Sequence, residues 1–319
     1  MIINTDHNLP LAVVVCGPTG IGKTAFAIEL ARRFKGEIIG ADSMQLYRRM
    51  DIGTAKPTPA EKAAVTHHMV DIIDPDGHFD AEIYADSAYA TVLALTGKGI
   101  LPFIVGGTGL YIKALIHGLF EGVTVDADVR QRLKNEAEEQ GGPSLHARLK
   151  AVDPAAAHRI HANDTYRIVR ALEIYESTGR PMSATQERHG FESRRLKTVK
   201  IGLYMEREAL YQRIDKRVDV MLDQGLLREV QSLMDAGYAQ DLKSMQSLGY
   251  RHMIAFLNNT LDWEEAVRTL KRDHRRYAKR QMTWFRADPE IVWLGPGDIE
   301  KAVSCIGAFT HDEYFIGGK

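Results

Sequence analysis

Residues 17–24, Gly-Pro-Thr-Gly-Ile-Gly-Lys-Thr, constrain the fold more than any other segment of the chain. They match the pattern G-x-x-x-x-G-K-[ST], in which backbone N–H groups and a helix N-terminus form a concave site for phosphate groups. The pattern requires a buried strand before it and a helix after it. Leu11–Cys16 is a continuous apolar run, as in a parallel strand buried on both faces, and residues 23–34 have apolar positions at helical spacing. The segment therefore predicts a site for a diphosphate or a triphosphate.

The pattern also assigns chemical roles within the loop. The side chain of Lys23 reaches the terminal phosphate oxygens, and the hydroxyl of Thr24 ligates Mg²⁺, which is the expected cofactor. Backbone groups supply the remaining contacts. The predicted phosphate-binding residues are Gly17, Pro18, Thr19, Gly20, Ile21, Gly22, Lys23 and Thr24.

Strands and helices alternate in the rest of the chain. Further strands are predicted at residues 37–41, 100–105, 198–205 and 291–294, with helices at 79–95 and 109–117. This order predicts an α/β fold with a parallel sheet flanked by helices, of the P-loop NTPase type. Residues 206–285 are expected to be mainly helical.

Strand patterns are absent between residues 121 and 195, where helix caps and breakers dominate. Helices are predicted at 128–139 and 166–177, the second capped by Asn163-Asp164 and ended by Gly179. We therefore expect a core made of residues 1–120 and 196–319, interrupted by an inserted all-helical lobe at 121–195.

Composition excludes several protein classes. The 41 Lys and Arg residues nearly balance the 42 Asp and Glu residues, so the chain as a whole is not a polycation, although local basic patches remain possible. The longest apolar runs are far too short to span a membrane, and the first residues lack a secretion signal. Cys16 and Cys305 are expected to be reduced thiols. These features predict a cytoplasmic protein with no membrane partner, and we expect it to be a monomer.

Asp42-Ser-Met-Gln45 follows the second predicted strand, at the edge of the sheet where α/β proteins bind ligands. Asp42 can act there as a general base or an outer ligand of Mg²⁺, or it can form an Asx turn or helix cap. The spacing alone leaves these alternatives open. Lys56, in the following loop, can meet a phosphate, but a single lysine is more often solvated.

The predicted helix at 268–286 carries a strong excess of positive charge. Eight Arg or Lys residues accompany one acid, Asp273, while Leu270, Tyr277 and Trp284 form an apolar stripe. Arg272, Arg276, Lys279 and Arg280 then lie on a broad positive face, which favours an acidic or nucleic-acid partner. The segment Met245–Arg251 supplies amide, aromatic and guanidinium groups suited to a base that has left its stack.

Taken together, these segments resemble the tRNA dimethylallyltransferase family, also called tRNA isopentenyltransferases, in its bacterial form. The matching segments follow one another in order through nearly the whole chain: residues 17–24, Asp42-Ser-Met-Gln45, Met50-Asp-Ile-Gly-Thr-Ala-Lys-Pro57, Val105-Gly-Gly-Thr-Gly-Leu-Tyr111, Arg167-Ile-Val-Arg-Ala-Leu-Glu173, Gly249-Tyr-Arg251 and Lys279-Arg-Gln-Met-Thr-Trp-Phe-Arg286. The zinc-finger extension of eukaryotic forms is not expected, because the two cysteines lie far apart.

The resemblance implies transfer of a dimethylallyl group from dimethylallyl diphosphate to the 6-amino group of the adenosine 3′ to a tRNA anticodon. It implies that Asp42 is the base, that Lys23 and Arg217 stabilise the leaving diphosphate and that Thr108 is a substrate-channel residue. The implied contacts with the tRNA anticodon stem-loop are Asp42, Ser43, Met44, Gln45, Thr108, Arg130, Tyr166, Arg167, Ile168, Val169, Arg170, Gln246, Ser247, Leu248, Gly249, Tyr250, Arg251, Lys279, Arg280, Gln281, Met282, Thr283, Trp284, Phe285 and Arg286.

Three other functions compete with this interpretation. A kinase that uses ATP on a small acceptor explains the phosphate loop and Asp42, but not the basic helix. An enzyme that prenylates free adenine nucleotides leaves the basic segments without a role. A non-catalytic RNA-binding module predicts no dependence on Asp42.

Overall fold

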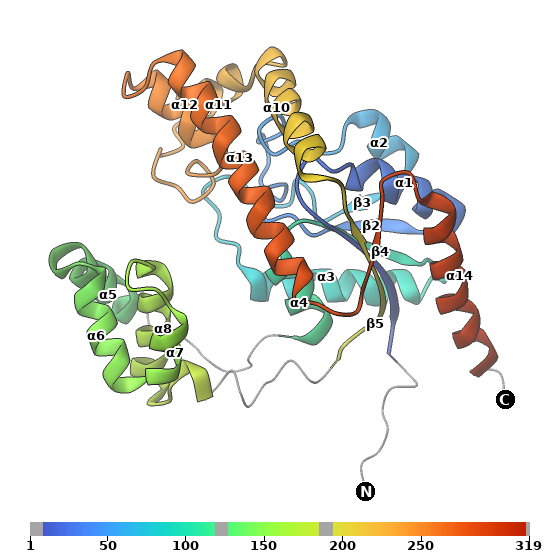
Figure 1. The fold of residues 1–319 in the computed structure, drawn as a ribbon, viewed down its shortest axis with the longest axis horizontal. Coiled ribbons are helices and arrows are strands. Elements are labelled where there is room, and N and C mark those ends of the chain that lie inside the picture. The colour runs from blue at the N-terminus through green and yellow to red at the C-terminus, as the bar shows by residue number, and fades with distance from the viewer. Residues whose placement is uncertain (1–8, 119–126, 185–193, 317–319) are drawn as a thin grey trace, which may run out of the picture. The chain divides into compact units, whose positions relative to one another are not determined.

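The computed structural model describes residues 9–118, 127–184 and 194–316. Its sheet has six strands, all parallel, in the order β3-β2-β4-β1-β5-β6 (Figure 1). The predicted α/β fold with a parallel sheet is therefore confirmed. The strands are β1 (Leu11–Cys16), β2 (Glu37–Gly40), β3 (His67–His68), β4 (Pro102–Gly106), β5 (Lys197–Leu203) and β6 (Ile291–Leu294).

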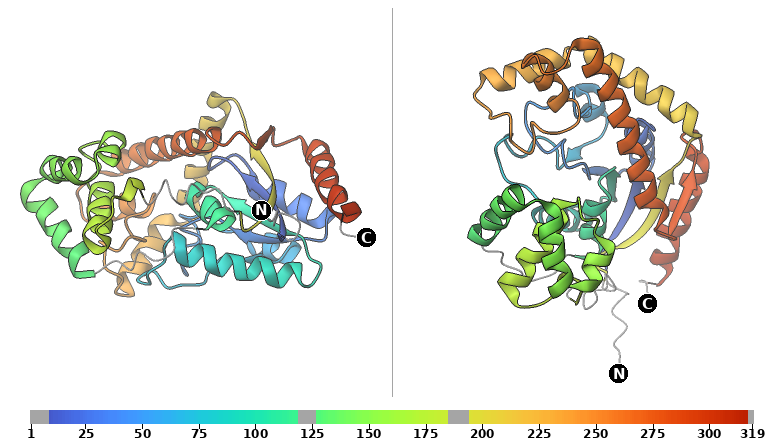
Figure 2. Two further views of the ribbon diagram at one scale, coloured as in Figure 1. Left: turned by 90° about the horizontal axis from the view of Figure 1, so that it is seen from below. Right: turned by 60° about the vertical axis from the view of Figure 1, so that its left-hand side comes forward.

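Helices lie on both faces of the sheet (Figure 2), and alternate residues of β1 pack against them. Val13 and Val15 belong to a cluster with α1 (Lys23–Arg33) and α14 (Ile299–Ile316). Val14 and Cys16 join the cluster with α3 (Ala81–Thr96) and α4 (Gly109–His117). Because neighbouring side chains of a strand point to opposite faces, the uninterrupted apolar sequence of β1 is what a strand between two helical layers needs.

The carboxyl ends of three neighbouring strands carry the glycine-rich and acidic segments. The phosphate loop follows β1, Asp42 follows β2, and Gly107 with Thr108 follows β4. Pairing of Cys16 with Gly106, and of Gly40 with Val105, places the three strand ends side by side. Parallel pairing thus brings residues that lie far apart in the sequence to one edge of the sheet.

A further helical layer borders this edge. It contains α10 (Arg207–Asp223), α11 (Leu226–Asp235), α12 (Tyr250–Leu257) and α13 (Trp263–Arg286). Their apolar residues share one cluster with Tyr47 and Met50 from the loop that follows β2. The loop is therefore packed on this layer as well as joined to the sheet.

Residues 117–194 form a separate compact unit. Within it, α5 (Ala127–Gln140), α6 (Gly142–Val152), α7 (Pro154–Arg159) and α8 (Thr165–Thr178) surround Leu133, Leu149, Ile168 and Leu172, which are all at most 1% exposed. Asp164 caps α8 at its start, and Gly179 ends it in the left-handed conformation with φ 69°.

Four elements were absent from the sequence predictions: α2 (Pro59–Ala64), β3, α6 and α14. Among the helices in the described ranges, none is long and apolar enough to cross a membrane.

Candidate functional site

The phosphate loop has the backbone conformation that its glycines permit. Gly17, Gly20 and Gly22 have φ values of +142°, +79° and +104°, which side chains with a Cβ atom rarely adopt. Helix α1 begins directly after the loop and has no side-chain cap. The N–H groups of residues 20–24 make no hydrogen bond within the described ranges. The loop therefore presents a row of uncommitted donors at a helix N-terminus, as an anion site requires.

Two cations lie beside this loop. The Nζ of Lys23 donates a 2.9 Å hydrogen bond to the carbonyl of Pro18, so the ammonium folds back over its own loop. Burial lowers the pKa of Lys23 to about 8, and the charge of Asp42 opposes that change. Burial also lowers the pKa of Arg217, again opposed by Asp42. Within the described part of the chain, the Arg217 guanidinium has neither a hydrogen bond nor an ion pair. Its positive charge is therefore available to a ligand.

Asp42 lies in a turn that Thr108 helps to fix. Its Oδ1 atom accepts a hydrogen bond of 2.9 Å from the N–H of Met44, which is an Asx turn. The Thr108 Oγ1 accepts a 3.1 Å hydrogen bond from the N–H of Ser43, and the N–H of Thr108 donates to the carbonyl of Ala41. The two alternatives considered for Asp42 are thus compatible: one oxygen orders the turn, and the carboxyl group still lines a pocket.

This pocket, of about 280 Å³, brings together several of the predicted site residues. The hydroxyl of Ser247 in its wall is buried and has no hydrogen-bond partner in the described chain, so it is available to a bound molecule. The lining residues are Thr19, Asp42, Ser43, Met44, Gly53, Thr54, Arg217, Met221, Gln246, Ser247, Leu248, Arg251, His274, Tyr277 and Arg280. The pocket therefore combines the carboxylate of Asp42, the buried hydroxyl of Ser247 and the guanidinium of Arg217, which is unpaired in the described chain.

Some predicted contact residues hold the walls of this pocket instead of lining it. The Gln45 amide donates two 3.1 Å hydrogen bonds to the carbonyls of Thr54 and Ala55. The Tyr250 ring is fully buried, and its hydroxyl donates to Glu229. The Gln281 amide bridges Thr19 and Gly107. For these three side chains, the structure shows a supporting position within the protein.

The predicted contact residues of the helical unit differ widely in exposure. Tyr166 is 81% exposed, whereas Ile168 and Val169 are buried in the core of the unit. Arg130 and Arg170 both pair with the buried carboxylate of Glu173, at 2.5 Å and 2.9 Å. Tyr166 and the exposed Arg167 are therefore the side chains of α8 with free surface for a partner, while the others contribute to the packing of the unit.

Ion pairs divide α13 into two halves. In its first half, Arg268 pairs with Glu265, Lys271 with Asp219, Arg272 with Asp273, and Arg275 with Asp215. In the second half, Lys279, Arg280 and Arg286 form no ion pair within the described residues. The exposed positive face is therefore shorter than the sequence predicted, because Arg272 is neutralised by its neighbour.

The apolar stripe of α13 also differs from the prediction. Leu270 is fully buried, but Trp284, two heptads later, is 45% exposed and Phe285 is buried in its place. A strict seven-residue repeat drifts by about 20° per heptad around a straight α-helix. The stripe predicted from Leu270, Tyr277 and Trp284 therefore rotates off the buried face, and the buried residues shift to His274, Ala278, Gln281 and Phe285.

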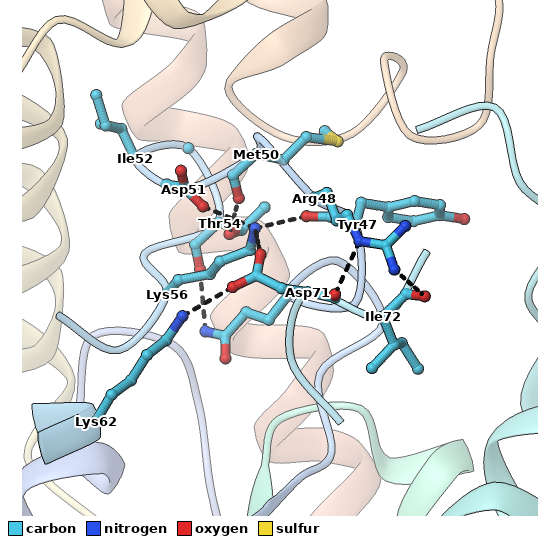
Figure 3. Close-up of polar contacts among 12 residues, drawn as sticks. Tyr47, Arg48, Met50, Asp51, Ile52, Thr54, Lys56, Lys62, Asp71 and Ile72 are labelled. Atoms are coloured by element: carbon cyan, nitrogen blue, oxygen red, sulfur yellow. Dashed lines mark hydrogen bonds and ion pairs between the residues drawn. The ribbon is translucent and has the colours of Figure 1, made fainter. Parts of the chain in front are cut away.

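Lys56 is neither a free phosphate ligand nor a solvated side chain (Figure 3). Its buried ammonium donates to the carbonyl of Tyr47 at 2.5 Å and to the carboxylates of Asp51 and Asp71 at 2.7 Å and 2.5 Å. Lys62 binds the other oxygen of Asp71 at 2.8 Å. With three acceptors, the ammonium is fully satisfied, and it fixes the loop at residues 50–56 against the segment that follows β3.

Sequence reasoning missed several residues of the pocket. Gly53, Thr54 and Met221 carry no chemical signature by themselves. His274 and Tyr277 were also missed. Together with Arg280, which was predicted, they are three residues apart in α13, and this spacing places all three on one face of the helix. That periodicity was a usable signal. Burial lowers the pKa of His274 to about 4, so its imidazole faces the pocket as a neutral group.

Comparison with known proteins places these features in a family. A model of the family described as IPP transferase matches residues 45–288. The tRNA dimethylallyltransferase of Desulfosudis oleivorans is 55% identical over 89% of this chain and 91% of that protein. The chain belongs to the IPP transferase family. The resemblance inferred from the sequence motifs is thereby confirmed.

Solved structures of IPP transferases show the same fold. The tRNA isopentenylpyrophosphate transferase of Bacillus halodurans is 42% identical, with a TM-score of 0.70 over 96% of this chain and 97% of that one. A eukaryotic dimethylallyltransferase described as acting on tRNA is 27% identical, with a TM-score of 0.78 over 97% of this chain and 80% of that one. The described fold is therefore that of an IPP transferase.

Proposed function

We propose that this IPP transferase transfers a dimethylallyl group from dimethylallyl diphosphate to the exocyclic 6-amino group of the adenosine 3′ to the anticodon of tRNA. The observation that carries the proposal is that an uncommitted phosphate loop borders, at Thr19, a pocket lined by Arg217, unpaired in the described chain, and by the carboxylate of Asp42. A diphosphate ester needs the first two groups, and an amine nucleophile needs the third. The names of the relatives support the choice of both substrates.

Asp42 would act as the general base. In the reaction, a bond forms between the adenine amino nitrogen and C1 of the dimethylallyl group while the bond from C1 to the diphosphate oxygen breaks. The amino group then loses a proton, which the carboxylate accepts, and inorganic diphosphate leaves. An aromatic amine is a weak nucleophile until its proton begins to move, so a carboxylate fixed beside it lowers the barrier. The Asx turn holds Asp42 in place for this step.

The leaving diphosphate would gain its stabilisation from the phosphate loop. The free amides of residues 20–24, the ammonium of Lys23 and the guanidinium of Arg217 all face negative charge that develops as the C–O bond breaks. Positive charge that is positioned in advance needs no reorganisation at the moment of reaction. Lys23 and Arg217 would therefore act on the leaving group, and Asp42 on the nucleophile.

The residues of the loop fit a magnesium ion that arrives with the diphosphate. The hydroxyl of Thr24 is half-buried and makes no hydrogen bond within the described chain, and hydroxyl and phosphate oxygens are the hard ligands that Mg²⁺ prefers. Thr24 would hold the ion. When bound, Mg²⁺ neutralises part of the charge on the diphosphate.

The tRNA would bind through the exposed cations of α13 and the exposed surface of α8. Arg280 lines the pocket and forms no ion pair in the described chain, so it can meet a phosphate next to the reacting base. Tyr166, with 81% exposure, offers a ring for stacking. We expect the enzyme to act as a monomer in the cytoplasm.

The proposal is tested by a mass measurement on nucleosides. Unmodified tRNA is incubated with the enzyme, Mg²⁺ and either dimethylallyl diphosphate or ATP, and is then digested. A prenyl-sized mass gain on adenosine with the allylic donor alone is expected. If adenosine gains no mass while ATP is consumed with a small acceptor, the proposal is wrong and the chain is a kinase.

A further inference from the structure

Asp273 is an acidic residue on a basic helix. Between positions 268 and 286 it is the only acid, among eight Arg and Lys residues. A negative charge on a face that attracts nucleic acid weakens this attraction, because it repels phosphates and offsets one of the cations. The contacts of the Asp273 carboxylate explain why an acid stands at this place.

The carboxylate of Asp273 accepts hydrogen bonds from three side chains. Its Oδ2 atom lies 2.7 Å from Nη2 of Arg251 and 3.3 Å from Nε2 of His252. Its Oδ1 atom lies 2.9 Å from Nε of Arg272. Burial alone would raise the pKa of Asp273, but these hydrogen bonds hold it well below its ordinary value. The group is therefore an anion at neutral pH, and it holds two guanidinium groups.

This carboxylate joins two helices beside the pocket. Arg251 and His252 belong to the first turn of α12, whereas Asp273 lies in α13. His252 is buried, and burial lowers its pKa, so its imidazole is neutral at neutral pH and contributes to the packing of the two helices. The Arg251 side chain is 42% exposed and lines the pocket. Of the partners of Asp273, Arg251 is therefore the one that can meet a bound molecule.

Most of the Arg251 guanidinium is free for a ligand. Within the described ranges, only its Nη2 group donates a hydrogen bond, which leaves the Nε and Nη1 groups available. The guanidinium is planar, so the bond from Nη2 to Asp273 restricts the directions in which the other donors point. A long side chain that is ordered in advance loses less conformational entropy on binding. Asp273 thus prepares Arg251 for a ligand in the pocket.

We propose that Asp273 is a positioning residue for tRNA recognition, because it holds the Arg251 guanidinium in the pocket wall with donors left for the nucleotide that enters. The inference rests on the proposed function, since it concerns the tRNA substrate of the same pocket. It explains how an acid can favour the binding of a polyanion. The order that Asp273 imposes on Arg251 outweighs the positive charge that it removes from the helix.

The first test uses the full-length Asp273→Asn variant. This substitution removes a negative charge, so simple electrostatic attraction predicts a higher kcat/KM for tRNA. Loss of positioning predicts the opposite, a decrease in kcat/KM for tRNA of about tenfold. Steady-state kinetics with saturating dimethylallyl diphosphate and varied tRNA measures the change. An unchanged or increased kcat/KM in a folded Asp273→Asn variant would overturn the proposal.

A double-mutant cycle separates positioning from a merely structural role. Arg251→Gln removes the guanidinium that Asp273 is proposed to position, and kcat/KM for tRNA should fall by about tenfold. In the Arg251→Gln background, Asp273→Asn should then cause no further loss. Losses that multiply, as for two independent sites, would show that Asp273 supports the helices without acting through Arg251.

Arg272→Gln is the matched control. It removes a second guanidinium from the same carboxylate, at a position outside the pocket lining, so its effect on kcat/KM should be clearly smaller than that of Arg251→Gln. Equal losses would contradict the special role of Arg251. This comparison also decides the matter if melting curves show that Asp273→Asn does not fold.

The outcomes separate this inference from the proposed function. Titration calorimetry with inorganic pyrophosphate and Mg²⁺ should give wild-type affinity in each folded variant, because the phosphate loop is intact. A wild-type enzyme that does not modify tRNA contradicts the proposed function. A wild-type enzyme that modifies tRNA, beside a folded Asp273→Asn variant that does so equally well, contradicts only the role of Asp273.

Discussion

The phenolic hydroxyl of Tyr250 donates a 2.5 Å hydrogen bond to Oε1 of Glu229. The same carboxylate accepts hydrogen bonds from the backbone N–H groups of Asp51, Ile52 and Gly53, at 2.9 Å, 2.8 Å and 3.1 Å. One side chain of α11 thus holds the loop that carries Gly53 and Thr54 into the pocket, and it also holds the first residue of α12. Two walls of the pocket depend on this carboxylate.

Replacing Glu229 with Ala is expected to lower the free energy of unfolding by about 2–4 kcal/mol, because three backbone donors and a buried hydroxyl lose their acceptor. Tyr250→Phe, which removes one of these donors, should cost about 1 kcal/mol. Urea denaturation measures both. Glu208→Ala, at an exposed position of α10 with no hydrogen bond or ion pair among the described residues, serves as the control. Equal stability of Glu229→Ala and this control would contradict the role of Glu229.

The affinity for pyrophosphate is expected to fall as the pH rises above about 8. The pKa of Lys23 is lowered to about 8, so the ammonium that attracts the anion is lost through that range. Pyrophosphate itself titrates, so the comparison is with Lys23→Arg, whose guanidinium stays charged. Calorimetry should show a steeper decline in affinity for the wild type than for this variant. Parallel pH profiles would argue against the lowered pKa.

The stability contribution of Lys23 has the opposite sign. Between about pH 8 and its ordinary pKa of 10.5, the folded protein binds fewer protons at Lys23 than the unfolded chain does. This group therefore makes unfolding less favourable as the pH rises through that window. Lys23→Met should remove this increment from the pH dependence of the unfolding free energy, which denaturation at several pH values measures.

Asp42→Asn is expected to reduce kcat by about 10²–10⁴-fold, because the amide cannot accept the proton of the amino group. The substitution keeps an oxygen for the Met44 N–H, so the turn should persist. Single-turnover kinetics measures the chemical step, and a filter-binding assay checks that the affinity for tRNA is unchanged. Near-normal turnover in this variant would exclude Asp42 as the base.

Arg280→Gln is expected to weaken tRNA binding and to reduce the slope of log K against log salt by about one, because one phosphate contact is lost. Arg268→Gln on the same helix is the matched control. Its guanidinium is already paired with Glu265 in bidentate geometry, at 2.6 Å and 2.7 Å. If both variants change the slope equally, the division of α13 into a paired and an unpaired half has no role in binding.

The Cys16 thiol should resist alkylation in the folded enzyme. Burial raises its pKa to about 12, so the reactive thiolate is scarce at neutral pH. Cys305 is partly exposed and should react first with iodoacetamide. Peptide mapping by mass spectrometry measures both sites, and modification of Cys16 at the rate of Cys305 would contradict this expectation.

Local patterns predicted the elements that position the site. The strand at Leu11–Cys16, the helix at Gly109–His117 and the strand at Ile291–Leu294 have the predicted bounds, and the helix predicted at 79–95 is α3, Ala81–Thr96. These signals lie within one element and rest on side-chain periodicity or on a capping residue. Two-residue β3 has no such periodicity, and it is a strand because His67 and His68 pair with Ile38 and Ile39.

Periodicity and capping residues within one element could not predict contacts between distant segments. Glu229 lies more than a hundred residues from the loop that it holds, and nothing in the sequence around it distinguishes it from a solvated glutamate. Lys56 was interpreted from its own loop, whereas Asp71 decides its role. Gln281 was predicted as a tRNA contact, whereas in the structure its amide bonds to Thr19 and Gly107. In each case the partner, and not the residue type, determines the function.

The hydrogen bonds of Glu229 have a consequence for how this protein uses its backbone. Residues 51–53 and residues 20–24 are both short runs of backbone N–H groups, and the first run converges on the carboxylate of Glu229. The first run already holds an anion that belongs to the chain and can never diffuse away. The second makes no hydrogen bond in the described chain, and in the proposed function it binds a diphosphate that is released after each reaction. The same backbone chemistry would thus hold a permanent anion beside the pocket and an exchangeable anion in the phosphate loop.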